Sequence, residues 1–207
     1  MKKYKIILTG LVVLLPMFAG LILWKNLPDM IATHFGFNNV PNGWSSKGFT
    51  VFGMPLILLA AQIICLFATL NDPKKKNIGT GMMNFVIWIV PAISVVVGLM
   101  IYLTAFKINV NVGVIISLLI GALFVSMGFA IMKVKQNYTV GIKLPWTLAS
   151  EENWNRTHHF AGRVWIICGA VFAANIFFPF KWIAFVAMAV MIILPIIYSF
   201  VLYKKGV

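Results

Sequence analysis

The sequence has few charged residues. Asp, Glu, Lys and Arg make up 10% of its 207 residues, and only 4 of them are acidic, whereas an ordinary soluble domain has about a quarter charged residues. Hydrophobic residues make up 61% of the chain, in runs that approach or exceed the roughly 18 to 20 residues with which a helix crosses a bilayer. The composition excludes an ordinary soluble domain and indicates a polytopic, all-α membrane protein.

Motifs for catalysis and metal binding are also absent. The chain has no HExxH motif, no nucleotide-binding loop and no His-x3-His or Cys-x2-Cys spacing. Cys65 and Cys168 lie in apolar runs, where cysteine behaves as a small buried hydrophobic residue. We therefore expect no metal, no cofactor and no enzymatic activity. The enzyme alternative, with His34 or His158 as acid or base, lacks a partner carboxylate within an apolar run.

Six apolar runs are predicted to be transmembrane helices, and none contains Asp, Glu, Lys, Arg or His. They are Ile6–Trp24, Phe49–Leu70, Met82–Leu103, Val110–Met132, Val164–Phe180 and Trp182–Tyr203, with a tight turn predicted at Phe178–Lys181. Ion-coupled carriers usually need charged groups near the bilayer midplane, so the runs disfavour coupled transport. A permease for small molecules or lipids is the alternative function. Prolines inside four runs predict kinks, with neighbouring helices satisfying the freed carbonyls.

The basic residues predict the orientation. With the N-terminus inside, 13 of the 17 Lys and Arg residues fall on the cytoplasmic side and the other 4 outside, as the positive-inside rule requires. Both termini are therefore predicted to be cytoplasmic, in a multi-pass protein of the cell membrane. Because membrane topology accounts for the net charge of +13, we expect no direct binding to nucleic acid.

The runs predict two units. Residues 1–71 would form an N-terminal two-helix unit with an external loop at 25–48. Residues 72–207 would form a C-terminal four-helix unit with a cytoplasmic loop at 133–163. These two loops are the longest polar segments, so they are where we expect recognition to occur.

In the cytoplasmic loop, a helix is predicted to begin after Pro145, with Thr147 or Ser150 as its cap and Glu151 and Glu152 in its first turn. Helical spacing places Trp154, His158, Ala161 and Trp165 on one face, and Glu152, Arg156, His159 and Arg163 on another. One interpretation is a binding epitope with tryptophan anchors; the other is an interfacial helix in contact with membrane lipids. The candidate binding residues are Gly141, Pro145, Trp146, Thr147, Trp154, Arg156, Thr157, His158 and Arg163.

The external loop contains the other candidates, which are Asp29, His34 and Trp44. They could form part of an outward-facing site, or else belong to a short folded cap with a surface histidine and an interfacial tryptophan. Asn42-Gly43 is a strong turn signal, so we expect a turn there.

Two groups of residues carry a family resemblance. Gly141-Ile-Lys-Leu-Pro-Trp-Thr-Leu, then Glu152, Trp154, Thr157-His158 and Gly162-Arg163, resembles the signature of the SdpI/YfhL family of bacterial membrane immunity proteins. Leu27-Pro28, Thr33-His34-Phe35 and Lys47 are similar to the small N-terminal domain that often precedes it. The sequence departs from the usual Arg and Thr at Lys143 and Leu144, which removes bidentate recognition by arginine at that point.

The resemblance implies protection against a secreted peptide toxin of the SdpC type. It also implies a signal receiver that holds a cytoplasmic transcriptional autorepressor at the membrane. A toxin contact is then expected outside or within the membrane, and a partner contact at the cytoplasmic loop. Binding would bias one of two conformations, which requires a different affinity for each.

Overall fold

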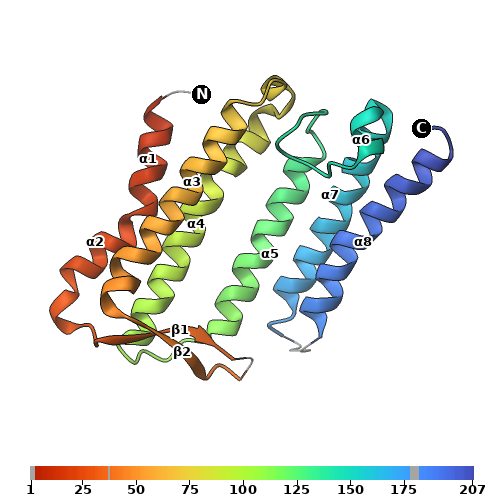
Figure 1. Ribbon diagram of the computed structural model, residues 1–207. Helices are drawn as coiled ribbons and strands as arrows, with labels where there is room; N and C mark the ends of the chain where they lie inside the picture. Colours follow the sequence, from red (N-terminus) through yellow and green to blue (C-terminus); the bar gives the residue numbers. More distant parts are fainter. Residues whose placement is uncertain (1–2, 37, 178–181) are drawn as a thin grey trace. The chain divides into compact units, whose positions relative to one another are not determined.

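The computed structural model describes residues 3–36, 38–177 and 182–207 (Figure 1). The predicted turn at Phe178–Lys181 lies outside the described residues. The helices are α1 (Lys3–Val13), α2 (Leu15–Ile22), α3 (Met54–Leu70), α4 (Gly79–Ala105), α5 (Val112–Ile131), α6 (Pro145–Ala149), α7 (Glu151–Ala174) and α8 (Ile183–Lys204). A π-helical turn, Phe49–Gly53, leads directly into α3.

Among the described residues, four helical segments are long and apolar enough to cross a membrane: Phe49–Leu70, Gly79–Ala105, Val112–Ile131 and Ile183–Lys204. Helices α1 and α2 are bent by 41° and make a fifth if the pair is one span. The protein is therefore a multi-pass membrane protein with four or five such spans. The predicted span Val164–Phe180 lies partly on α7. The N-terminal half of α7 is polar, so α7 as a whole is not apolar enough to be counted among these spans.

The chain is mostly helical, as predicted, but the loop predicted to be external contains strands that the all-α prediction did not include. They form an antiparallel hairpin of β1 (Met30–Phe35) and β2 (Pro41–Ser46). The turn predicted at Asn42-Gly43 is also wrong, because both residues lie within β2. The chain turns instead between Gly36 and Val40, joined by a 2.9 Å hydrogen bond from Gly36 N to Val40 O. Asn39 has a positive φ of 62°, a conformation that asparagine tolerates better than most residues.

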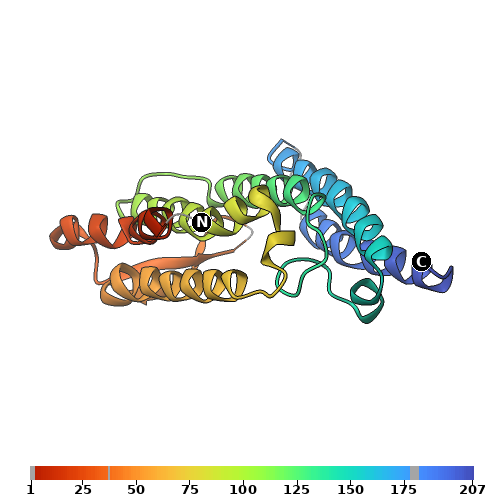
Figure 2. The same cartoon turned by 90° about the horizontal axis from the view of Figure 1, so that it is seen from above.

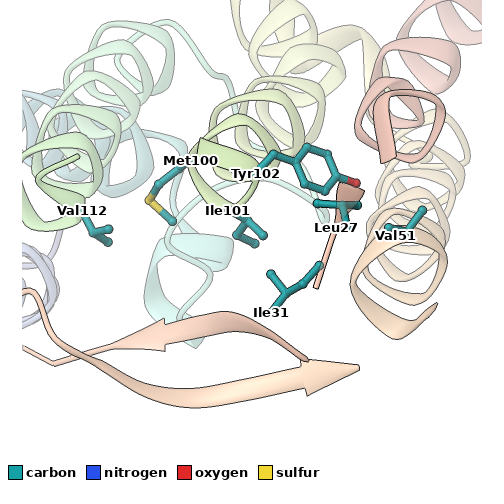
Figure 3. Close-up of a cluster of buried hydrophobic side chains, with 7 residues drawn as sticks. All are labelled: Leu27, Ile31, Val51, Met100, Ile101, Tyr102 and Val112. Carbon is teal, nitrogen blue, oxygen red and sulfur yellow. The ribbon is translucent and has the colours of Figure 1, made fainter. Parts of the chain in front are cut away.

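The chain divides into two compact units. The first comprises Met1–Cys65 and Ile87–Ile116. Figure 3 shows its core, in which Ile31 of β1 points from the hairpin toward Ile101 and Leu27. Because Ile31 is only 1% exposed, its burial fixes which face of the hairpin is turned away from solvent.

The second unit comprises Leu66–Val86 and Ser117–Val207. The predicted division of the chain into residues 1–71 and 72–207 stays a prediction. Helices α7 and α8 lie side by side in it (Figure 2). Helix α7 also packs closely against α5, because glycines face glycines. A Cβ added to Gly121 would lie 2.7 Å from Gly169 O, and one added to Gly128 would lie 2.6 Å from Gly162 O. Such close backbone approach requires small residues.

Two proline-freed carbonyls are satisfied by neighbouring helices, as predicted. Pro91 in α4 cannot donate to Ile87 O, and Gln62 Nε2 of α3 donates to that oxygen at 2.8 Å. Pro195 in α8 likewise frees Met191 O, and Trp165 Nε1 of α7 donates to it at 3.0 Å. Each pair replaces the missing helical hydrogen bond with an interhelical one.

Candidate functional site

The loop predicted to be cytoplasmic, residues 133–163, is anchored at a buried carboxylate that the sequence analysis did not single out. Asp72, between α3 and α4, accepts hydrogen bonds from Thr139 Oγ1, from Tyr138 N at 2.9 Å and from Lys74 N at 2.7 Å. Burial raises the pKa of Asp72, but these hydrogen bonds outweigh it and hold the pKa below its usual value. The only available sequence signal was that Asp72 is one of 4 acidic residues.

Gln136 joins the same anchor to the next part of the loop. Its Oε1 accepts from Lys74 Nζ at 2.9 Å, while its Nε2 donates to Leu148 O at 2.8 Å and to Thr147 O at 3.2 Å. Gln136 is 7% exposed. A buried amide satisfied on both sides fixes the loop more firmly than a solvent-exposed one.

Thr147 closes the turn that begins α6. Its Oγ1 accepts from Leu144 N at 2.9 Å and donates to Ile142 O at 2.8 Å. Pro145 occupies the first turn of α6, where its missing N–H costs nothing. The predicted cap of the next helix is confirmed for Ser150, whose Oγ accepts from Asn153 N at 3.2 Å.

His158 is the point at which the loop meets α7. It has no exposed surface. Ile142 N donates to its Nε2 at 2.8 Å, so Nδ1 carries the proton and donates to Trp154 O at 2.7 Å. Burial lowers the pKa of His158 from 6.5 to about 4, with the bond to Trp154 O opposing this and the nearby His159 adding to it. His158 is therefore neutral at physiological pH.

Gly141 makes this contact sterically feasible. Its φ is +130°, in a region that residues with a side chain rarely adopt. A Cβ at this position would lie 2.5 Å from His158 Nε2 and 2.8 Å from the Trp154 ring. Any side chain at 141 would thus collide with the histidine that holds the loop.

Trp154 is completely buried and stacks on His158, with ring centroids 4.0 Å apart. Its Nε1 donates to Val134 O at 2.9 Å. The helical face predicted to contain Trp154, His158 and Ala161 is thus an inward face. In this conformation neither aromatic ring offers surface to a partner.

A second group ties the loop to α8. Trp146 Nε1 donates to Ser199 Oγ at 3.0 Å, and its ring packs on Phe200 and Tyr203 with centroid distances of 5.4 and 5.8 Å. Asn153, also missed by the sequence analysis, donates to Ser199 O at 3.0 Å. Its Oδ1 accepts from Thr157 Oγ1 at 3.1 Å, so buried Thr157 acts within the same group.

The polar face of α7 is exposed. Arg156 forms an ion pair with Glu152 one turn earlier. His159 and Arg163 are exposed further along the same face. Of the nine candidates in the loop, Arg156 and Arg163 therefore present charge to the surroundings, whereas Trp154, Thr157, His158 and Thr147 are buried.

The three candidates around the hairpin are not gathered into one cluster. The Asp29 side chain is 97% exposed and pairs with Lys47 Nζ at 3.2 Å. His34 Nδ1 donates to Asn42 Oδ1. Asp29 directly precedes β1 and His34 lies near the C-terminal end of that strand, so the two residues are at opposite ends of it. Trp44 lies on β2, is 55% exposed and is free to contact a partner.

A small cavity in the first unit and the potential metal ligands do not indicate a binding site. The first unit has a cavity of about 20 Å³ lined by residues that include Pro16, Ser94 and Tyr102, far below the roughly 300 Å³ of a small-molecule pocket. Among the described residues, no three His, Cys, Asp or Glu side chains lie close enough to hold a metal ion.

Comparisons with known proteins agree with the resemblance read from the sequence. Residues 133–199 match the SdpI/YfhL protein family, and residues 11–59 match a domain of unknown function (DUF1648). The chain is 26% identical over 199 residues to the protein named "Immunity protein SdpI" from Bacillus subtilis (strain 168), covering 94% of this chain and 92% of that protein. No solved structure matches. The predicted resemblance is confirmed, and it includes the small N-terminal domain.

Proposed function

We propose that this protein is an integral membrane immunity protein that protects a bacterium against a secreted peptide toxin of the SdpC type. The observation that carries the proposal is the similarity to an immunity protein over 92% of that protein's length. The similarity spans both family matches, so the external hairpin and the cytoplasmic loop are both included.

The proposal includes six spans with both termini in the cytoplasm. Helices α1 and α2 together make the first span, and the C-terminal part of α7 makes the fifth. Gly162 and Gly169 of α7 contact the backbone of Gly128 and Gly121, which lie in an apolar α5 long enough to cross the membrane. A helix that packs so closely beside a span is itself in the membrane, which supports the fifth span.

In this proposal the unit formed by residues 1–71 meets the toxin from outside. Trp44 supplies a large exposed apolar surface, and Asp29 and His34 supply polar groups at the two ends of β1. Hairpin residues can serve as contacts because buried Ile31 holds the strand in place. Exposed aromatic side chains on a rigid scaffold are typical of binding hot spots.

The unit formed by residues 72–207 would receive the signal. Arg156 is exposed for a cytoplasmic partner, such as a transcriptional autorepressor held at the membrane. Gly141, Thr147, Trp154, Thr157 and His158 would act by fixing the loop that carries them, and Pro145 and Trp146 by seating it on α8. A toxin with different affinities for two arrangements of the bundle would then change what the loop presents.

The test is survival of a toxin-sensitive Gram-positive strain that carries this gene. We expect wild type to protect against an SdpC-type peptide, and Trp146→Ala and His158→Ala to lose protection at matched membrane abundance. Trp88→Ala is the control, because Trp88 is a 45% exposed residue in α4 with no part in the loop. Failure of wild type to protect would contradict the immunity proposal. Retained protection in both loop variants would mean that the loop is not needed for protection and serves only in signalling.

A further inference from the structure

The packing of α7 on α5 places Arg163 at an unexpected depth. Gly121 faces Gly169 and Gly128 faces Gly162, so the two helices are antiparallel and paired residue numbers sum to 290. Arg163 therefore lies level with Met127, four residues before α5 ends at Ile131. At 1.5 Å per residue, its Cα lies about 6 Å before the end of α5, measured along that apolar helix.

Arg163 also lies on the exposed side of α7. One turn further into the membrane on the same face, Ile167 is 64% exposed, and Val171 beyond it is 36% exposed. One turn in the other direction lies exposed His159. Among the residues that the structure describes, no hydrogen-bond acceptor or carboxylate pairs with the Arg163 guanidinium. A bare guanidinium in hydrocarbon is costly, so the group must reach a polar partner.

Helix geometry directs the side chain toward such a partner. Cα–Cβ bonds in a helix tilt toward its N-terminus, and the N-terminus of α7 is on the membrane face where α5 ends and exposed Lys133 and Lys135 follow. An extended arginine can cover about 6 Å by snorkelling to the headgroup layer. A planar guanidinium binds phosphate oxygens in pairs, which an ammonium does not.

We propose that Arg163, with His159 one turn above it, forms a binding site for the phosphate headgroup of an anionic phospholipid. The exposed guanidinium of Arg163 and its position along α7 both match a lipid phosphate. The site would hold α7 at a fixed height in the membrane, below the cytoplasmic loop. This proposal depends on the insertion of α7 beside α5 and not on toxin immunity.

Native mass spectrometry of the purified full-length protein in detergent tests the site. Dioleoylphosphatidylglycerol and dioleoylphosphatidylcholine are titrated separately, and retained lipid is counted. We expect wild type to bind phosphatidylglycerol about tenfold more tightly than phosphatidylcholine, and Arg163→Gln to lose most of that preference. Lys205→Gln, which removes an exposed cationic group at the end of α8, should keep it.

Several outcomes would overturn the proposal. These are equal binding of the two lipids by wild type, an unchanged preference in Arg163→Gln, or an equal loss in Lys205→Gln. Displacement of phosphatidylglycerol by millimolar inorganic phosphate would show a small-anion site instead. Should Arg163→Gln fail to fold, Arg163→Lys decides. It keeps the charge but loses the paired geometry, and should bind phosphatidylglycerol at least threefold more weakly; wild-type affinity would contradict arginine-specific recognition.

Discussion

The β1–β2 hairpin and the loop of residues 133–163 use the same kinds of residues in opposite ways. Each contains a histidine and a tryptophan that the sequence marked as binding candidates. On the hairpin, His34 is exposed and Trp44 is 55% exposed. In the loop, His158 and Trp154 have no exposed surface and stack on each other. Residue type and spacing therefore do not distinguish a contact residue from one that positions the chain.

The difference follows from what each segment packs against. The hairpin buries only one face, through Ile31, so its other face is free for contact. The loop lies between Asp72 and the side of α7, and its polar groups are paired with buried partners. We therefore expect loop substitutions to act through stability, and hairpin substitutions to act through binding.

Gly141→Ala, in the buried loop, should have the largest effect on stability. The added Cβ would combine a φ that alanine rarely adopts with overlap of the His158 and Trp154 rings, so we expect a loss of about 3 kcal/mol or more of unfolding free energy. Thermal unfolding in detergent measures it. Gly81→Ala is the control, since nothing lies within 4 Å of a Cβ there. Equal stability of the two variants would mean that the loop is not locked against His158.

Acidification should destabilise the loop next most strongly. The pKa of His158 is about 4 in the folded protein and 6.5 as a free group, so between these values the unfolded chain binds a proton that the folded protein does not. The stability that the neutral His158 contributes is therefore present above pH 6.5 and is lost as the pH falls toward 4. From pH 7 to pH 5 we expect a loss of about 2 kcal/mol.

His158→Asn separates this effect from general acid denaturation. It should reduce the loss between pH 7 and pH 5, measured by the same thermal unfolding, whereas His34→Asn on the exposed hairpin should leave that loss intact. A wild-type pH dependence in His158→Asn would contradict the account of a buried neutral histidine.

Asn39→Ala should weaken the hairpin more modestly. Asn39 Nδ2 donates to Val110 O at 3.1 Å and its Oδ1 accepts from Val112 N at 2.8 Å, tying the turn to the α4–α5 connection. Loss of both bonds, at a residue with positive φ, should cost about 1 to 2 kcal/mol. Faster amide exchange in β1 and β2 would reveal it. Asn38→Ala, which removes one exposed 3.3 Å bond, should change exchange little.

Trp44→Ala should have the smallest effect on stability, within about 0.5 kcal/mol, because half of this side chain is already exposed. Its effect on toxin protection should nevertheless be large if the hairpin is the contact surface. Survival at matched membrane abundance, alongside thermal unfolding, separates the two effects. Unchanged protection in Trp44→Ala would remove Trp44 from the toxin contact.

Local patterns predicted much of the helical structure. The apolar runs located α3, α4, α5 and α8, because a spanning helix must satisfy its backbone groups internally. The Ser150 cap and the Glu152–Arg156 pair also depend only on near neighbours. Features that depend on three or four residues of spacing were therefore accessible from sequence.

Long-range partners decided the rest. The hairpin turn falls at Gly36–Val40 rather than at Asn42-Gly43 because the Asn39 side chain binds the α4–α5 connection, 71 to 73 positions later in the chain. Helical spacing grouped Trp154 with His158, but their burial depends on Val134 O and Gly141, which no local pattern reveals. Asp72 was missed for the same reason, since its main partners are Tyr138 and Thr139.

Hydroxyl-radical footprinting of Trp44 and Trp154 in the membrane, with and without an SdpC-type peptide, tests the central comparison most directly. We expect Trp44 to be oxidised rapidly and Trp154 slowly in the free protein. Addition of the peptide should protect Trp44. Oxidation of Trp154 as fast as Trp44, or no protection of Trp44 by a peptide against which the protein gives immunity, would contradict the account.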